Sequence, residues 1–304
     1  MAITAAMVKE LRELSGAGMM DCKKALTETD GNMEKAVEYL REKGLAKAAK
    51  KAGRIAAEGL VATCVSEDGK TAAIVEVNSE TDFVAKNDKF VTFVKQVAEQ
   101  VKATSATDVE GFLAEAWALD TAKTVSEELA SQIAVIGENM NIRRFEKLTV
   151  ENGFIETYIH AGGRIGVLVE FEGEATDAAK ECAKNVAMQV AAIAPKYVDR
   201  SEVSEEYIAH ETEILKVQAM NENPGKPENI IEKMVVGRLN KELKEVCLVD
   251  QAYVKDGDLT VAKYIASVSS DLKVKKFVRF ETGEGIEKAE DNFAEEVARQ
   301  IAGN

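Results

Sequence analysis

The sequence predicts an α+β protein in which a small helical module precedes a core built from two copies of one α+β unit. Apolar residues recur at helical spacing over about the first fifty positions, and short β-rich runs replace that pattern from Gly59 onward. The segment GKTAAIVE at 69–76 also resembles GRIGVLVE at 163–170, and each lies in a strand–turn–strand–helix order. Two copies of that order favour a duplicated core of strands and helices.

Length and charge set the first limits on function. The chain has 304 residues, which is typical of two domains, and 46% of them are hydrophobic, enough for a packed core. Acidic residues outnumber basic ones by 53 to 39, which gives a net charge of −14. Because nucleic-acid affinity depends on Lys and Arg neutralising phosphates, we expect a function without direct nucleic-acid contact.

The cysteine pattern and the hydropathy indicate a reducing compartment. The sequence has four cysteines and no CxxC pair among them: Cys22, Cys64, Cys182 and Cys247. We therefore expect reduced, mostly buried thiols and no local zinc site. No apolar run approaches the ~18 residues of a membrane span, and the start of the chain does not resemble a signal peptide. We therefore expect a cytoplasmic protein without membrane contact.

Three short helices are expected in the N-terminal module, 1–55. The first ends at an SGAG turn, and the second runs from Met19 to a DG stop. Asn32 is a candidate N-cap for the third helix, whose apolar residues follow at helical spacing. The Ala- and Lys-rich stretch 43–54 is interpreted as a linker helix, with a nucleic-acid-binding stripe as the weaker alternative.

The core is expected to consist of two similar subdomains. The first spans 56–148, and the second combines 149–198 with 247–282. Strands are expected at 60–65, 71–77, 154–160 and 165–171, and helices at 88–101, 125–136 and 175–194.

A helical hairpin, 199–246, is expected to interrupt the second subdomain. Two helical stretches, 202–221 and 228–246, flank a turn that holds two of the three prolines, as in an antiparallel hairpin. A helix and a strand are expected within 261–280. The chain should then end in a C-terminal helical module, 283–304.

Enzyme signatures are absent from the sequence. The GxG segments at 16–18 and 283–285 lack the preceding strand and the third glycine of a dinucleotide site. His160 and His210 are the only histidines, and their pattern is not that of a metal-binding pair. The sequence therefore predicts no catalytic residue, no metal and no cofactor, and it favours a binding protein over an enzyme.

The segment NSETDFVAKN at 78–87 lies between a predicted strand and a predicted helix, where functional loops are common. Glu80 and Asp82 are two positions apart, which turns them to opposite sides of an extended chain, so they are not expected to act as paired acids. Local rules favour Thr81 or Asp82 as a helix cap and Phe83 as a core anchor. The alternative hypothesis is that the acid and the aromatic side chain project together into a partner protein.

Five motifs, in this order, resemble those of the bacterial translation elongation factor Ts family. They are SGAGMMDCKKAL at 15–26, TDFVAK at 81–86, IGENMNIRR at 136–144, YIHAGGRIGV at 158–167 and ETGEGIEK at 281–288. The likeness extends from one end of the chain to the other. It implies a three-helix ubiquitin-associated-like module, a core of two similar α+β subdomains, a projecting hairpin and a C-terminal helix.

The activity that this resemblance implies is guanine-nucleotide exchange on elongation factor Tu. By its TDFVAK motif, the resemblance implies that four residues disturb the Mg²⁺ site of that partner: Thr81, Asp82, Phe83 and Val84. Asp82 and Phe83 would wedge between two helices of its GTPase domain. Further partner contacts are implied for five residues: Met19, Met20, Ile136, Gly137 and His160.

The implied partner is elongation factor Tu, both GDP-bound and nucleotide-free. The hairpin matches no strong motif, so a homodimer or heterotetramer formed through it stays an open hypothesis. The alternative function is a ubiquitin-associated-type adaptor that binds other proteins through its N-terminal module. That alternative would leave most of the chain without a role.

Overall fold

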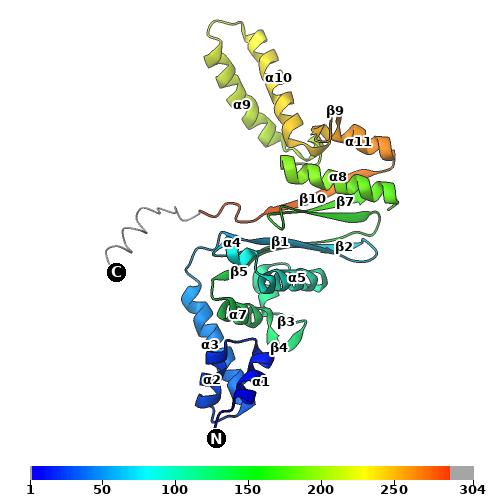
Figure 1. Cartoon of the computed structure of the whole chain (residues 1–304). Helices are drawn as coiled ribbons and strands as arrows, with labels where there is room; N and C mark the ends of the chain where they lie inside the picture. Colours follow the sequence, from blue (N-terminus) through cyan, green and yellow to red (C-terminus); the bar gives the residue numbers. More distant parts are fainter. Residues whose placement is uncertain (1, 288–304) are drawn as a thin grey trace.

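The structure is a computed structural model that describes residues 2–287 (Figure 1). Three N-terminal helices come first, followed by two antiparallel three-stranded sheets with helices on their outer faces, and a helical hairpin lies at the opposite end (Figure 1). The predicted α+β class is confirmed. The predicted C-terminal helix, and most of the predicted module 283–304, lie outside the described residues.

The N-terminal module consists of α1 (Ala5–Ser15), α2 (Met19–Glu28) and α3 (Met33–Lys51). The Asn32 side chain accepts a hydrogen bond from the Lys35 N–H and caps α3, as the sequence predicts. The predicted third helix and the predicted linker helix are one continuous helix, because no proline or helix-ending turn separates them. Small and aliphatic side chains form the core of the module: Val8, Leu11, Cys22, Ala25, Leu26 and Ala36.

α3 fixes this module to the first subdomain. It packs along α7 (Val125–Ile136), and a Cβ added at the buried Gly44 would lie only 3.7 Å from the Ala134 Cβ. The Arg41 guanidinium forms an ion pair with Glu127 of α7. The module is therefore held by a helix–helix contact as well as by its connection along the chain.

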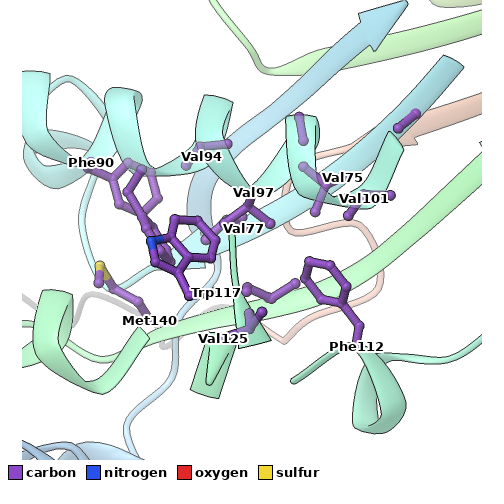
Figure 2. Close-up of a cluster of buried hydrophobic side chains, with 14 of the residues drawn as sticks. Val75, Val77, Phe90, Val94, Val97, Val101, Phe112, Trp117, Val125 and Met140 are labelled. Carbon is purple, nitrogen blue, oxygen red and sulfur yellow. The ribbon is translucent and has the colours of Figure 1, made fainter. Parts of the chain in front are cut away.

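The first sheet contains β1 (Glu58–Val65), β2 (Thr71–Ser79) and β5 (Met140–Thr149), paired antiparallel in the order β1-β2-β5. α5 (Asp88–Ala103) covers its outer face. Figure 2 shows side chains of α5, β2 and β5 gathered around Trp117. The strand β5 is absent from the sequence-based expectations, because charged residues interrupt its alternating apolar pattern.

The second sheet repeats this arrangement. It contains β6 (Phe154–His160), β7 (Ile165–Glu172) and β10 (Lys273–Glu281), in the order β10-β7-β6. α8 (Asp177–Ile193) covers its outer face, and α11 (Val261–Val268) precedes β10 as α7 precedes β5. In both units the third strand pairs with the second, so the predicted duplication is confirmed.

A buried glutamine on the main helix of each unit ties down a small hairpin. The Gln100 side chain donates to the Ala116 carbonyl and accepts from the N–H two residues further on, both at 2.9 Å. Gln189 makes the same two contacts: its side chain donates to the Ala252 carbonyl at 3.0 Å and accepts at 2.8 Å from the backbone N–H two positions after Ala252. The duplication therefore extends to buried polar contacts. The small hairpins are β3 (Ala116–Trp117) with β4 (Asp120–Thr124), and β8 (Ala252–Tyr253) with β9 (Asp256–Thr260).

The inner faces of the two sheets pack closely on each other. The Val61 N–H on β1 donates to the Gly163 carbonyl in the β6–β7 turn at 2.7 Å. A Cβ at Gly166 would lie 2.4 Å from the Val61 side chain, so glycine allows this close approach. Aliphatic and aromatic side chains of both sheets form the shared core: Val61, Ala72, Ile74, Leu148, Val150, Ile155, Leu168 and Phe280.

α9 (Glu205–Glu222) and α10 (Glu228–Val246) form the predicted helical hairpin. It projects from the second unit, at the end of the molecule far from α1, α2 and α3 (Figure 1). Ala219, Ile231 and Val235 pack within the hairpin, in a cluster separate from the cores of the two sheets. Further short helices are α6 (Val109–Ala114), η1 (Arg200–Glu202) and η2 (Leu248–Asp250). Among residues 2–287, no helix is both long enough and apolar enough to cross a membrane.

Candidate functional site

A one-turn helix, α4 (Asp82–Ala85), occupies the loop between β2 and α5. Phe83 on this turn is 81% exposed, more than any other large hydrophobic side chain among the described residues. Val84 and Ala85 are buried instead. The expectation that Phe83 is a core anchor is therefore wrong. Successive helical positions point roughly 100° apart, so a turn that buries Val84 directs Phe83 toward solvent.

Thr81 is the N-cap of α4. Its hydroxyl oxygen accepts a hydrogen bond from the Val84 N–H at 3.3 Å. Thr81 also donates twice to one carboxylate: its hydroxyl donates to Glu138 Oε1 at 2.7 Å, and its backbone N–H donates to Oε2 at 3.0 Å. Of the two candidate caps in the sequence, Thr81 is therefore the one used, and it is itself held from outside the loop.

The two acidic residues of the loop have different partners, as their spacing predicts. Asp82 Oδ2 accepts a hydrogen bond from Lys86 Nζ at 2.6 Å, and this hydrogen bond lowers the pKa of the exposed Asp82 carboxyl. Glu80 Oε1 accepts from the Asn139 N–H at 2.5 Å and lies 3.5 Å from the Arg54 guanidinium. The two carboxylates therefore do not form an acid–base pair.

The end of α7 lies directly beside this loop. The helix ends at Ile136, and Gly137 adopts a left-handed conformation (φ 94°) that reverses the chain direction toward β5. This turn presents Glu138 to Thr81. The exposed Gly137 also accepts a hydrogen bond from Lys51 Nζ through its carbonyl oxygen. The structure therefore brings two of the predicted contact residues, Ile136 and Gly137, next to the loop.

Met19 and Met20 form the first positions of α2, in the N-terminal module. Their side chains are 60% and 73% exposed, so neither is buried among the three helices. Together with residues of α1, including Val8 and Arg12, they line a shallow groove. These two methionines thus present flexible, polarisable side chains to solvent, as protein-binding surfaces often do.

His160 ends β6 and is exposed at the β6–β7 turn, where residues 161–163 all have positive φ values. The Tyr158 hydroxyl lies 3.1 Å from His160 Nδ1, a hydrogen bond that orients the imidazole ring. Among residues 2–287, no hydrogen bond or ion pair joins His160 to the loop or to the end of α7.

The residues that hold the loop in place are not among the predicted contact residues. Glu138 and Glu80 fix the two sides of the loop, and the Asn139 side chain donates to the Arg54 carbonyl at 2.7 Å. The motif at 136–144 contains Glu138, but nothing in its local pattern indicates a partner that lies 57 positions earlier. Long-range pairing of this kind leaves little signal in a single sequence.

The site consists of an exposed aromatic side chain and the hydrogen-bonded carboxylates that surround its loop. Within the part of the chain that the structure describes, no group of three or more His, Cys, Asp or Glu side chains is arranged to hold a metal ion. The four cysteines are free thiols, and only Cys64 is not fully buried. An exposed aromatic side chain on a capped, anchored turn is typical of a protein-binding hot spot. The geometry therefore suits contact with another protein, with Phe83 as the anchor.

Comparison with known proteins gives consistent results. A family model described as "Elongation factor TS" matches residues 80–284, which include the loop, the end of α7 and the β6–β7 turn. The chain is 61% identical over 304 residues to elongation factor Ts of Clostridioides difficile (strain 630), covering 98% of this chain and 99% of that relative. It is 59% identical over 304 residues to elongation factor Ts of Clostridium novyi (strain NT), with the same two shares covered.

Proposed function

The chain belongs to the elongation factor Ts family of translation elongation factors, and on this premise we propose that it releases GDP from elongation factor Tu. The observation that carries the proposal is Phe83, an exposed aromatic side chain on a one-turn helix whose cap is fixed by Glu138. A nucleotide-exchange factor needs such a feature, because it must displace groups inside its partner without reacting with them.

In the proposed mechanism α4 acts as a wedge. GTPases hold Mg²⁺ through a Ser or Thr and an Asp, and the ion bridges the phosphates of the nucleotide. Asp82 and Phe83 would insert between two helices of the GTPase domain, with Thr81 and Val84 supporting the turn from behind. A small displacement of the metal ligands weakens the affinity for the ion and for the phosphates together.

Contacts outside the wedge would supply the binding free energy for this displacement. Met19 and Met20 would contact the GTPase domain from the N-terminal module, and Ile136, Gly137 and His160 would contact it from the core. Coupling between two ligands is reciprocal, so GDP bound to elongation factor Tu must weaken the affinity of the factor to the same extent. The factor should therefore bind the nucleotide-free partner more tightly than the GDP-bound partner.

The proposed activity needs no covalent chemistry from this chain. The protein would act in the cytoplasm as an exchange factor rather than as an enzyme, and it would bind neither nucleotide nor metal itself. The division into a module at 1–55, two subdomains and a hairpin at 199–246 is part of the same proposal. Self-association through the hairpin, as a homodimer or a heterotetramer with the partner, would be separate from exchange.

Release of a fluorescent GDP analogue from elongation factor Tu tests the proposal. We expect the purified chain to accelerate release at substoichiometric concentration, because one factor molecule can act on many partner molecules in turn. Excess unlabelled GDP should compete with the factor for the partner. A release rate that does not change with the concentration of the chain would refute the proposed function.

A further inference from the structure

α4 has too little intrinsic stability to hold its own shape. It contains four residues, and an isolated helix of one turn is not stable in water. Val84 and Ala85 pack against the core, whereas Asp82 and Phe83 face solvent. Packing therefore fixes one side of the turn only, and the direction of Phe83 needs a second constraint.

That constraint is a reciprocal pair of contacts between the loop and the end of α7. Thr81 donates its N–H and its hydroxyl to the two carboxylate oxygens of Glu138, at 3.0 and 2.7 Å. In the opposite direction, the Asn139 N–H donates to the Glu80 carboxylate at 2.5 Å. Two adjacent residues of one segment thus bind two adjacent residues of the other. Charge-assisted hydrogen bonds in both directions resist rotation of the loop.

We propose that Glu138 is a positioning residue for nucleotide exchange: its carboxylate fixes Thr81 and thereby sets the direction of Phe83 before the partner binds. The kinetic consequence of this inference rests on the proposed function. Both carboxylate oxygens are engaged by Thr81, so Glu138 acts through that residue and is not part of the wedge. A turn that is already ordered avoids the entropy loss of ordering during insertion.

Two substitutions separate the contacts. Glu138→Ala removes both acceptors, whereas Glu138→Gln keeps one carbonyl acceptor and replaces the other oxygen with a donor. We expect the maximal rate of fluorescent-GDP release to fall about tenfold in the Ala variant and less in the Gln variant, because each charge-assisted bond contributes separately. The concentration of factor at half-maximal rate should change less than the maximal rate, since the proposed contacts of Met19, Met20 and His160 lie on other elements and are intact.

A matched control is available in the same subdomain. The Glu115 carboxylate also accepts a hydrogen bond from a threonine hydroxyl, that of Thr104, at 2.5 Å. Glu115→Ala therefore removes the same kind of contact without touching the loop. We expect this variant to accelerate GDP release from elongation factor Tu as much as the unmodified chain does. An equal loss of release in the Glu115 and Glu138 variants would overturn the inference.

Hydrogen exchange in the full-length chain tests the positioning role without the partner. The N–H groups of Thr81 and Val84 donate to Glu138 and to the Thr81 hydroxyl, so both should exchange about tenfold faster in Glu138→Ala and unchanged in Glu115→Ala. Unchanged protection of these two amides in Glu138→Ala would refute the inference. If the unmodified chain does not accelerate GDP release from elongation factor Tu, the proposed function fails. The amide exchange still decides in that case whether Glu138 orders the loop.

Discussion

The backbone N–H of Gly283 donates to the carboxylate of Glu76 at 2.8 Å, across 207 positions of sequence. Glu76 lies on β2 of the first sheet, and Gly283 lies in the turn after β10 of the second sheet. The carboxylate is fully buried and also binds Arg143 (3.0 Å) and Arg144 (2.6 Å). Burial alone would raise the pKa of Glu76, but its hydrogen-bond donors, with the Gly283 N–H first, outweigh burial and lower the pKa. An ionised carboxylate thus joins the two sheets.

Replacing Glu76 by Gln should weaken this junction at neutral pH. The variant leaves two arginines without their buried partner, so the free energy of unfolding should fall by about 3–5 kcal/mol.

A carboxyl with a lowered pKa contributes stability above its unfolded pKa of about 4.3, and that contribution is lost as the pH falls through the folded pKa. Acidification below that range should therefore destabilise the unmodified chain more than Glu76→Gln. Thermal melts at neutral and acidic pH measure this difference, with the exposed Glu146→Gln as control. Parallel pH dependences of the Tm in the two proteins would contradict the assignment.

Phe83→Ala should separate binding from folding. The side chain is 81% exposed, so its removal should leave the Tm nearly unchanged. If Phe83 anchors the interface, its truncation should weaken the complex with elongation factor Tu by about 2–4 kcal/mol and slow GDP release. Leu119→Ala is the matched control, because Leu119 is 67% exposed on a different loop. A lowered Tm with normal release by Phe83→Ala would show that the wedge assignment is wrong.

Asp82→Asn should have a smaller effect than Phe83→Ala. The substitution keeps the shape of the side chain but removes its charge and its ion pair with Lys86. The Lys86 hydrogen bond holds the pKa of Asp82 below its usual range, so the carboxyl stays ionised through the neutral range and is protonated only as the pH falls through that lowered value. GDP release should therefore show no titration of Asp82 near neutral pH. Lys86→Met, which removes the ion pair and keeps Asp82, separates the two effects. A larger loss for Asp82→Asn than for Phe83→Ala would favour electrostatic disturbance over wedging.

Met19→Ala combined with Met20→Ala should weaken binding to the partner without unfolding the N-terminal module. Both side chains are mostly exposed, so little core packing is lost. The expected result is a higher factor concentration at half-maximal GDP release, with a smaller change in the maximal rate. Met220→Ala, which truncates a methionine 54% exposed on α9, serves as control. Unimpaired binding by the double variant would remove these methionines from the interface.

Shortening α9 and α10 equally from their turn should preserve GDP release. The cluster of Ala219, Ile231 and Val235 lies within the hairpin and not in the sheet cores, so its removal should leave the Tm of the core unchanged. Self-association, measured by sedimentation, is the property that this deletion should alter if the hairpin mediates it. Leu243→Ala provides the contrast, because Leu243 is buried at the base and its truncation should cost about 2–5 kcal/mol of stability. A collapse of the Tm after shortening would show that the hairpin supports the core.

Several elements could be predicted from local patterns. The sequence indicates helices over 125–136 and 228–246 and a strand over 154–160, and the structure has elements with these same bounds. Caps, turns and apolar periodicity lie within a few residues of the elements that they define, so one segment contains the whole signal. The duplicated order of strands and helices follows from the same local information.

The strand β5 and the two small hairpins escaped sequence reasoning for a physical reason. Adjacent charged residues interrupt the alternating apolar pattern of β5, and two of them, Arg143 and Arg144, are satisfied by Glu76 on the neighbouring strand. The hairpins contain strands of two and five residues and depend on a distant glutamine side chain for their position. Neither arrangement can be recognised before the partner segments are known.

The sequence alone determined where the candidate functional loop lies, and the tertiary structure decided which of its residues faces outward. Local rules identify a capped turn at 81–84, but they favour a buried Phe83 because an aromatic side chain usually lies in the core. The choice depends on whether Val84 or Phe83 meets the packed surface, and Glu138, 57 positions away, fixes that orientation through Thr81. The local sequence indicates that a turn is present, whereas the direction in which a single turn points is set by the groups that surround it in space.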